Sequence, residues 1–184
     1  ESGTITYAGP EDEAPRPEGE MHEFSNLTAM PGLVDIHVHG GWGVEFGSGN
    51  LREGLKTYCE KVISRGVTGF LVTVSGPDHA TIINILENYA ALFDESYPGA
   101  VPLGFHLEGP FLNPKRHGAF NPDWLHNPSI EKVKDYITAA GGYLKQVSLA
   151  PELENAFETA AFLRGHGIRV ALAHSIADYE TAAR

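Results

Sequence analysis

From residue 31 onward, short apolar runs alternate with longer amphipathic stretches. The apolar runs are rich in β-branched and aromatic residues and predict five strands: Leu33–His39, Gly69–Val74, Leu103–Glu108, Lys145–Leu149 and Arg169–His174. In the stretches between them, apolar side chains recur every three or four positions, which predicts helices over residues 51–63, 79–93, 129–140 and about 153–165. Regular alternation of strand and helix is typical of parallel βα units and indicates an α/β protein.

Two architectures fit this alternation, a doubly wound open sheet and a (β/α)8 barrel. No G-x-G-x-x-G motif follows the first predicted strand, and polar residues gather at the carboxyl ends of several strands, which favours the barrel. A complete barrel takes about 250 residues, whereas this chain has 184. We therefore expect the first part of a (β/α)8 TIM-type barrel, about five βα units over residues 31–184, in a segment of a longer protein.

The first thirty residues have a different character. Seven acidic side chains face a single basic one there, Arg16, and three prolines interrupt the segment. The runs Thr4–Ala8 and Met21–Leu27 contain enough β-forming residues to predict strands on either side of an exposed acidic loop. We expect residues 1–30 to be part of a small N-terminal β domain, with a flexible tail as the alternative for residues 10–19.

Histidines and carboxylates gather at the ends of three predicted strands. In Asp35-Ile36-His37-Val38-His39 the two histidines lie two positions apart, so both point to the same face of a strand. His106 and Glu108 share a face in the same way, and His174 ends a third strand. A carboxylate at the end of an apolar strand is costly to bury unless it is paired or binds a cation.

One rim of the predicted barrel would thus present four metal-binding side chains: His37, His39, Glu108 and His174. This set suits one or two divalent metal ions, zinc first, with iron or manganese as alternatives. Asp35 and His106 would lie one layer deeper, and we expect them to support the ligands from behind.

Four motifs, in order along the chain, resemble a known family: Pro31–Gly41, Gly104–Asn113, Leu149–Glu152 and Ala173–Ser175. They look like those of the N-acetylglucosamine-6-phosphate deacetylases, in the amidohydrolase superfamily. The Pro-Gly-x-x-Asp-x-His-x-His pattern is common to many amidohydrolases, whereas the His-Leu-Glu-Gly-Pro-Phe run is more specific. The resemblance implies metal-dependent hydrolysis of the N-acetyl amide of N-acetylglucosamine 6-phosphate, which yields glucosamine 6-phosphate and acetate.

The resemblance also implies individual roles for the metal ligands. Glu108 and His174 match the family's main metal ligands, and His37 and His39 match a pair that holds a second metal in some members. Because the pair is intact, a binuclear site is expected.

The resemblance places Ala119 and Phe120 in a short substrate-binding loop. The family usually has histidine at the second position, and a phenylalanine cannot replace its hydrogen bond. A related substrate, such as N-acetylgalactosamine 6-phosphate, therefore stays open as the alternative. His117 is a candidate replacement for the lost contact, with an exposed loop histidine as the other interpretation.

Further family residues are expected beyond Arg184, among them the catalytic aspartate, another metal-binding histidine and the phosphate-binding residues. The resemblance therefore implies no catalytic residue within the chain, and we expect the chain to be inactive alone. It further implies a small-molecule amino-sugar phosphate as the partner and a homodimer as the complete protein.

Composition and the lack of certain motifs argue against several classes of function. The formal net charge of −11 argues against nucleic acid or an anionic membrane as a partner. No apolar run approaches the roughly 20 residues of a membrane span. The single cysteine, Cys59, fits a reducing compartment, and we expect a buried thiol in a cytoplasmic protein. No G-x-x-x-x-G-K-[ST] motif indicates a nucleotide-binding protein. A metal-binding βα protein without activity is the alternative from another class.

Overall fold

A computed structural model describes residues 4–16 and 18–184 of the chain. The chain divides into two compact units, Glu1–Pro31 and Gly32–Arg184, and each is described by itself. The larger unit contains a five-stranded parallel sheet in the order β1-β4-β5-β6-β7. These strands are Leu33–Val38, Val67–Val74, Val101–Glu108, Leu144–Leu149 and Arg169–Leu172. Every strand therefore pairs with the next large strand along the chain, as in a barrel and not in a doubly wound sheet.

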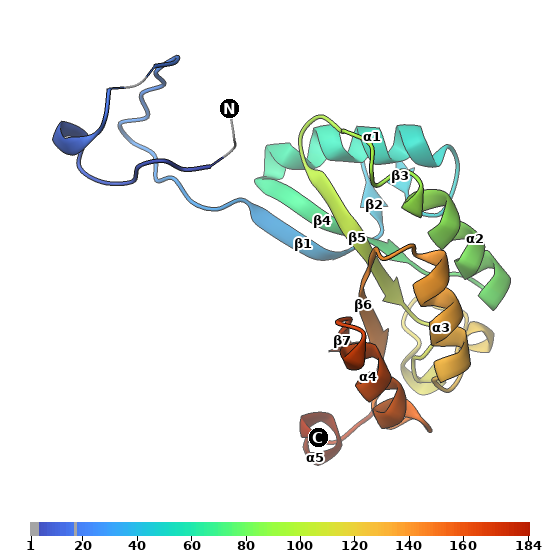
Figure 1. Cartoon of the computed structure of the whole chain (residues 1–184). Helices are drawn as coiled ribbons and strands as arrows, with labels where there is room; N and C mark the ends of the chain where they lie inside the picture. The colour runs from blue at the N-terminus through green and yellow to red at the C-terminus, as the bar shows by residue number, and fades with distance from the viewer. Residues whose placement is uncertain (1–3, 17) are drawn as a thin grey trace. The chain divides into compact units, whose positions relative to one another are not determined.

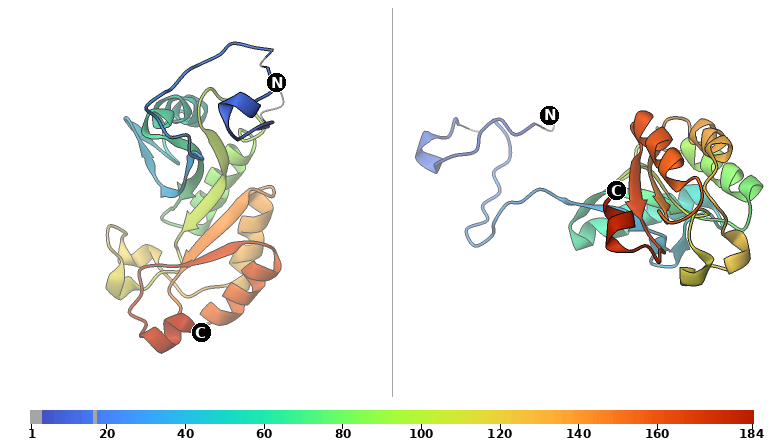
Figure 2. Two further views of the ribbon diagram at one scale, coloured as in Figure 1. Left: turned by 90° about the vertical axis from the view of Figure 1, so that its left-hand side faces the viewer. Right: turned by 90° about the horizontal axis from the view of Figure 1, so that it is seen from below.

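Helices connect the strands along one face of the curled sheet (Figures 1 and 2). They are α1 (Leu51–Val62), α2 (His79–Ala90), α3 (Ile130–Ala139) and α4 (Ala156–Gly165), followed by the short α5 (Tyr179–Ala183). Consecutive helices α1 to α4 contact each other. The prediction of a partial (β/α)8 barrel is thus confirmed. Among the described residues, no helix is long and apolar enough to cross a membrane.

Side-chain caps begin most of these helices. The side chains of Asn50, Asp78 and Ser129 accept hydrogen bonds from backbone N–H groups in the first turns of α1, α2 and α3. Helix α4 begins at Ala156, about three residues later than predicted, because Asn155 before it has a left-handed backbone with φ of 63°.

The core lies between the sheet and its helices. Rings from both layers, such as Tyr58 of α1 and Phe70 of β4, pack edge to face with centroids 4.7 Å apart. Cys59 is fully buried beside them, and burial raises the pKa of its thiol to about 12. The prediction that this cysteine is a buried thiol is confirmed.

A small hairpin after β1 is absent from the predicted elements. Strands β2 (Gly40–Gly41) and β3 (Val44–Glu45) pair antiparallel around Trp42 and Gly43, both with positive φ. Phe46 N–H then donates to the carbonyl of His39 at 2.9 Å. The hairpin therefore fixes the backbone of the residue that ends the H-x-H motif.

The strands predicted for Thr4–Ala8 and Met21–Leu27 are wrong for this structure. Within residues 4–16 and 18–31, the regular element is a short 3-10 helix, η1 (Glu11–Glu13), and no described residue is in a strand. A strand needs a hydrogen-bonded neighbour, and neither run finds one among the described residues. Assignment of residues 1–30 to a β domain stays a prediction.

Candidate metal centre

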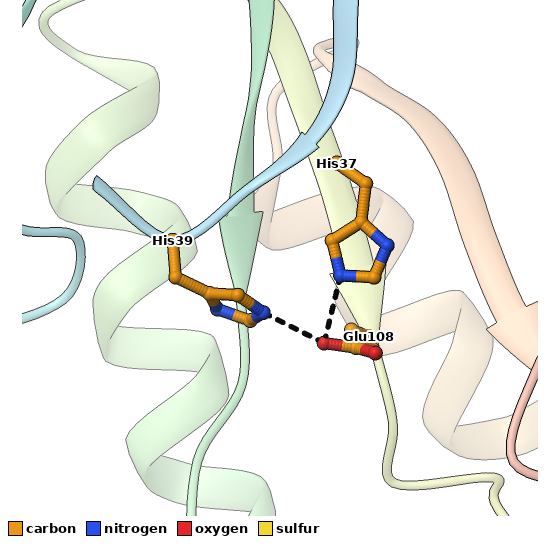
Figure 3. Close-up of side chains that lie close together, drawn as sticks. All are labelled: His37, His39 and Glu108. Atoms are coloured by element: carbon orange, nitrogen blue, oxygen red, sulfur yellow. Dashed lines mark hydrogen bonds and ion pairs between the residues drawn. The ribbon is translucent and has the colours of Figure 1, made fainter. Parts of the chain in front are cut away.

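Glu108 stands at the middle of the candidate site. It is the last residue of β5 and is only 4% exposed. Its Oε2 lies 2.7 Å from His39 Nε2 and 3.0 Å from His37 Nε2, as Figure 3 shows. Its other oxygen, Oε1, lies 3.2 Å from His174 Nε2. Three imidazoles therefore meet one buried carboxylate, with the H-x-H pair on one oxygen and the third ring on the other.

The carboxylate is strongly acidic in this setting. Burial by itself raises the pKa of Glu108, but hydrogen bonds and charge from His39 and His37 outweigh it and hold the pKa at about 2. Glu108 is therefore ionised throughout the neutral range, which is the state that binds a cation.

Side chains of β4 and of β1 itself hold the backbone of the H-x-H motif. Thr73 Oγ1 of β4 accepts a hydrogen bond from Val38 N–H at 2.9 Å, between the two histidines. Asp35 Oδ1 accepts one from His37 N–H at 3.0 Å, so Asp35 acts on the backbone of the motif. As predicted, the two imidazoles point to the same side of the chain, toward β5 (Figure 3).

His174 reaches the site by a different route from the one predicted. Strand β7 ends at Leu172 instead of continuing to His174, and His174 has a left-handed backbone with φ of 47°. Its Nδ1 lies 2.7 Å from the carbonyl oxygen of Arg116, which can only accept, so Nδ1 carries the proton. Nε2 faces Glu108 Oε1, and it is the nitrogen that a cation beside Glu108 would bind, with Nδ1–H held by a backbone carbonyl as is usual for a metal-binding histidine.

His106 is fully buried under the pair and contacts the ring of His37, with centroids 4.6 Å apart. Its own hydrogen bonds go to Thr73 Oγ1 (3.2 Å) and Ser148 Oγ (2.8 Å). His106 therefore supports the site by packing against His37, and its polar contacts lie behind the site. Burial and the nearby charge of His37 lower the pKa of His106 to about 4.

This lowered pKa predicts an acid-sensitive fold. The ordinary pKa of a histidine is about 6.5. As the pH falls, His106 therefore takes up a proton at a higher pH in the unfolded chain than in the folded protein. Its contribution to stability is complete above pH 6.5 or so and lost as the pH falls toward about 4, with a total of at most about 3 kcal/mol. Urea unfolding of the metal-free protein should show a free energy of unfolding that decreases as the pH falls through this range. His106→Asn should make this free energy depend less on pH. Parallel curves for the two proteins would contradict the prediction.

The loop after β5 brings the predicted substrate residues beside His174. The rings of Phe120 and His174 lie edge to face, 5.5 Å between centroids. Gly118 approaches His174 so closely that a Cβ there would lie 2.8 Å from Cε1. His117 Nδ1 donates to the carbonyl of Phe120, 2.8 Å away. Ala119 is exposed in the same loop.

Two polar residues near the site have no role in the sequence-based predictions, Asn113 and Glu152. Asn113 Nδ2 donates to Glu152 Oε1 at 2.8 Å, and Asn113 N–H donates to the carbonyl of His174 at 3.0 Å. Both belong to motifs that carry the family resemblance. Their contacts depend on three loops that meet only in the folded chain.

The donor chemistry fits a divalent metal ion. One ligand atom from each of His37, His39 and Glu108 lies within 4.8 Å of the others. Imidazole and carboxylate together suit zinc, iron or manganese better than calcium or magnesium. The structure therefore brings all four predicted ligands to one place, with Glu108 between His174 and the H-x-H pair.

Comparison with known proteins assigns the class. A model of the Amidohydrolase family matches residues 28–180, so the chain belongs to the amidohydrolase family. Among its relatives, N-acetylglucosamine-6-phosphate deacetylase of Bacillus subtilis (strain 168) is 36% identical over 162 residues, which are 86% of this chain and 41% of the relative. The deacetylase of Vibrio furnissii is 36% identical over 184 residues, 98% of this chain and 44% of the relative. The sequence-based resemblance is thereby confirmed.

Solved structures agree with this result. N-acetyl-D-glucosamine-6-phosphate deacetylase of Mycobacterium smegmatis superposes with a TM-score of 0.73 at 25% identity, over 82% of this chain and 42% of that chain. The deacetylase of Thermotoga maritima superposes with a TM-score of 0.71 at 29% identity, over 84% of this chain and 40% of that chain. The chain thus spans about two fifths of the length of the relatives it matches.

Proposed function

We propose that this chain is part of an N-acetylglucosamine-6-phosphate deacetylase and carries four of its metal ligands. The enzyme would hydrolyse the N-acetyl amide of N-acetylglucosamine 6-phosphate to glucosamine 6-phosphate and acetate. The observation that carries the proposal is the buried Glu108 carboxylate, met by imidazole nitrogens of His37, His39 and His174. The names of the relatives supply the substrate, and one Mycobacterium smegmatis structure is of a complex with that sugar phosphate.

The two oxygens of Glu108 suggest how the ligands divide. We assign His174 and Oε1 to a main metal ion, and His37, His39 and Oε2 to a second ion. We propose zinc as the metal, with iron or manganese as alternatives. A bound divalent ion supplies Lewis-acid polarisation of the amide carbonyl and lowers the pKa of water.

The chain's own residues prepare that site. Glu108 stays ionised because its pKa is about 2. The Arg116 carbonyl holds a proton of His174 on Nδ1, so Nε2, which faces Glu108, is the nitrogen that would bind the metal ion. We propose Ala119 and Phe120 as substrate contacts, with the Phe120 ring offering an apolar surface and no hydrogen bond. We assign the proton-transfer role to none of the residues that the structure describes.

Turnover of both candidate sugars by the complete protein tests the function. We expect acetate release from N-acetylglucosamine 6-phosphate to exceed release from N-acetylgalactosamine 6-phosphate, and chelation to abolish both. The reverse order would favour the related substrate. Metal binding without turnover of either sugar would favour a protein that has no deacetylase activity.

Three finer properties belong to the same proposal. We expect residues 1–184 alone to release no acetate, because the chain spans about two fifths of its relatives. We also propose that the complete protein is a homodimer and acts in the cytoplasm, with no nucleic-acid or membrane partner.

A further inference from the structure

We propose that Glu152 is a positioning residue for His174 and holds together the three loops that orient this imidazole. The inference rests on the proposed metal site, because it concerns how one ligand of that site is aimed. Glu152 lies in the loop between β6 and α4 and has no contact with Glu108 among its hydrogen bonds in the described chain. Its role is therefore exerted through other residues.

Glu152 first binds the segment that follows His174. Its Oε2 accepts a hydrogen bond from Ser175 Oγ at 2.6 Å, and its Oε1 accepts one from Ile176 N–H at 2.7 Å. Ser175 Oγ in turn accepts from Ala177 N–H at 2.8 Å. The carboxylate thus fixes the chain on the carboxyl side of a residue whose backbone is left-handed. Such a conformation is costly for a histidine, and it persists where surrounding contacts determine it.

The same carboxylate binds the loop on the other side of the imidazole. Oε1 also accepts from Asn113 Nδ2 at 2.8 Å, and Asn113 is itself buried. Asn113 N–H donates to the carbonyl of His174 at 3.0 Å. Asn113 Oδ1 accepts from Lys115 N–H at 2.9 Å and so begins the 3-10 helix η3 (Pro114–Arg116). That helix ends at Arg116, whose carbonyl accepts from His174 Nδ1.

These hydrogen bonds form a closed network around the side chain of His174. From Glu152, one path leads through Ser175 to the backbone of His174, and the other leads through Asn113 and Arg116 to its Nδ1. Both paths end on the same imidazole, and both begin on one carboxylate. Glu152 therefore sets the direction of Nε2 toward Glu108 without touching either group.

The test compares four variants of the complete protein: Glu152→Ala, Glu152→Gln, Ser175→Ala and the control Glu154→Ala. Glu154 is exposed and lies only two residues away. We would measure Zn²⁺ affinity by competition with a chelating dye. Nitrogen-15 NMR of the metal-free protein would follow the His174 Nδ1–H signal, assigned by its loss in His174→Asn.

We expect Glu152→Ala to weaken Zn²⁺ binding by about 10- to 100-fold, as loss of supporting residues around metal ligands does, and to weaken or remove the Nδ1–H signal. Glu152→Gln keeps an acceptor for Asn113 and Ile176, and its amide can donate to Ser175, so it should remain close to wild type. Ser175→Ala removes one contact and should give a smaller loss in the same direction. Glu154→Ala should change neither readout.

Wild-type Zn²⁺ affinity and an intact Nδ1–H signal in Glu152→Ala would overturn the positioning role. If Glu152→Ala does not fold, Ser175→Ala decides, and an unchanged signal there overturns the role. Failure of the proposed metal site would give a different result. The wild-type protein would then show no Zn²⁺ binding that Glu108→Gln removes, while the Nδ1–H signal would still report whether the hydrogen-bond network is intact.

Discussion

Glu108→Gln in the complete protein should lose Zn²⁺ binding and deacetylation together. Glutamine has the same shape but no charge, and its amide nitrogen cannot accept from an imidazole N–H. Among residues 4–16 and 18–184, Glu108 is the one residue whose oxygens meet all three imidazoles. The loss of affinity should therefore exceed the roughly 10- to 100-fold that removal of a supporting residue causes. Metal content by mass spectrometry and acetate release measure the two effects.

Glu87→Gln is the matched control, because Glu87 is exposed on α2 and the same substitution there changes charge alone. It should retain wild-type metal content and turnover. Stoichiometric zinc in Glu108→Gln would show that the buried carboxylate is not a ligand.

The double variant His37→Asn/His39→Asn should lose one metal ion per chain and keep the other. The pair meets only Oε2 of Glu108, whereas His174 meets Oε1, so the second ion should depend on the pair and the main ion should not. Metal content per chain, measured before and after dialysis, reports the number of ions, and turnover with one ion reports which of them the reaction needs.

His22→Asn/His166→Asn serves as the control, since both histidines are exposed. A complete loss of metal in the His37/His39 variant would instead indicate one ion shared by all three imidazoles. Unchanged metal content would contradict a role for the pair in binding.

The sequence predicted the parts of the site that depend on strand periodicity. His37 and His39 lie two apart in and just beyond β1, and Glu108 ends β5, so the alternation of side chains placed them correctly. The C-terminal ends of parallel strands meet at one edge, which explains why residues far apart in the chain converge.

What periodicity could not predict depends on loops and on tertiary pairing. His174 lies beyond β7 with a left-handed backbone, and its direction comes from Arg116, 58 residues earlier. The apolar runs near residues 5 and 24 have strand-forming residues but no described strand partner. Residue propensity alone therefore predicted strands that the structure does not have there. The role of Glu152 also depends on three loops, and a motif of four residues does not reveal it.

The place of the four predicted ligands in the fold has a consequence for how metal binding relates to folding. In many small zinc domains the ion is what makes the chain fold, because the unfolded chain has no preformed site. Here Glu108 ends the central strand of the five-stranded sheet, and the three imidazoles come from β1 and from the segments that directly follow β1 and β7. The hydrophobic core between the sheet and its helices holds these elements in place. Removal of a bound metal ion should therefore leave the barrel folded.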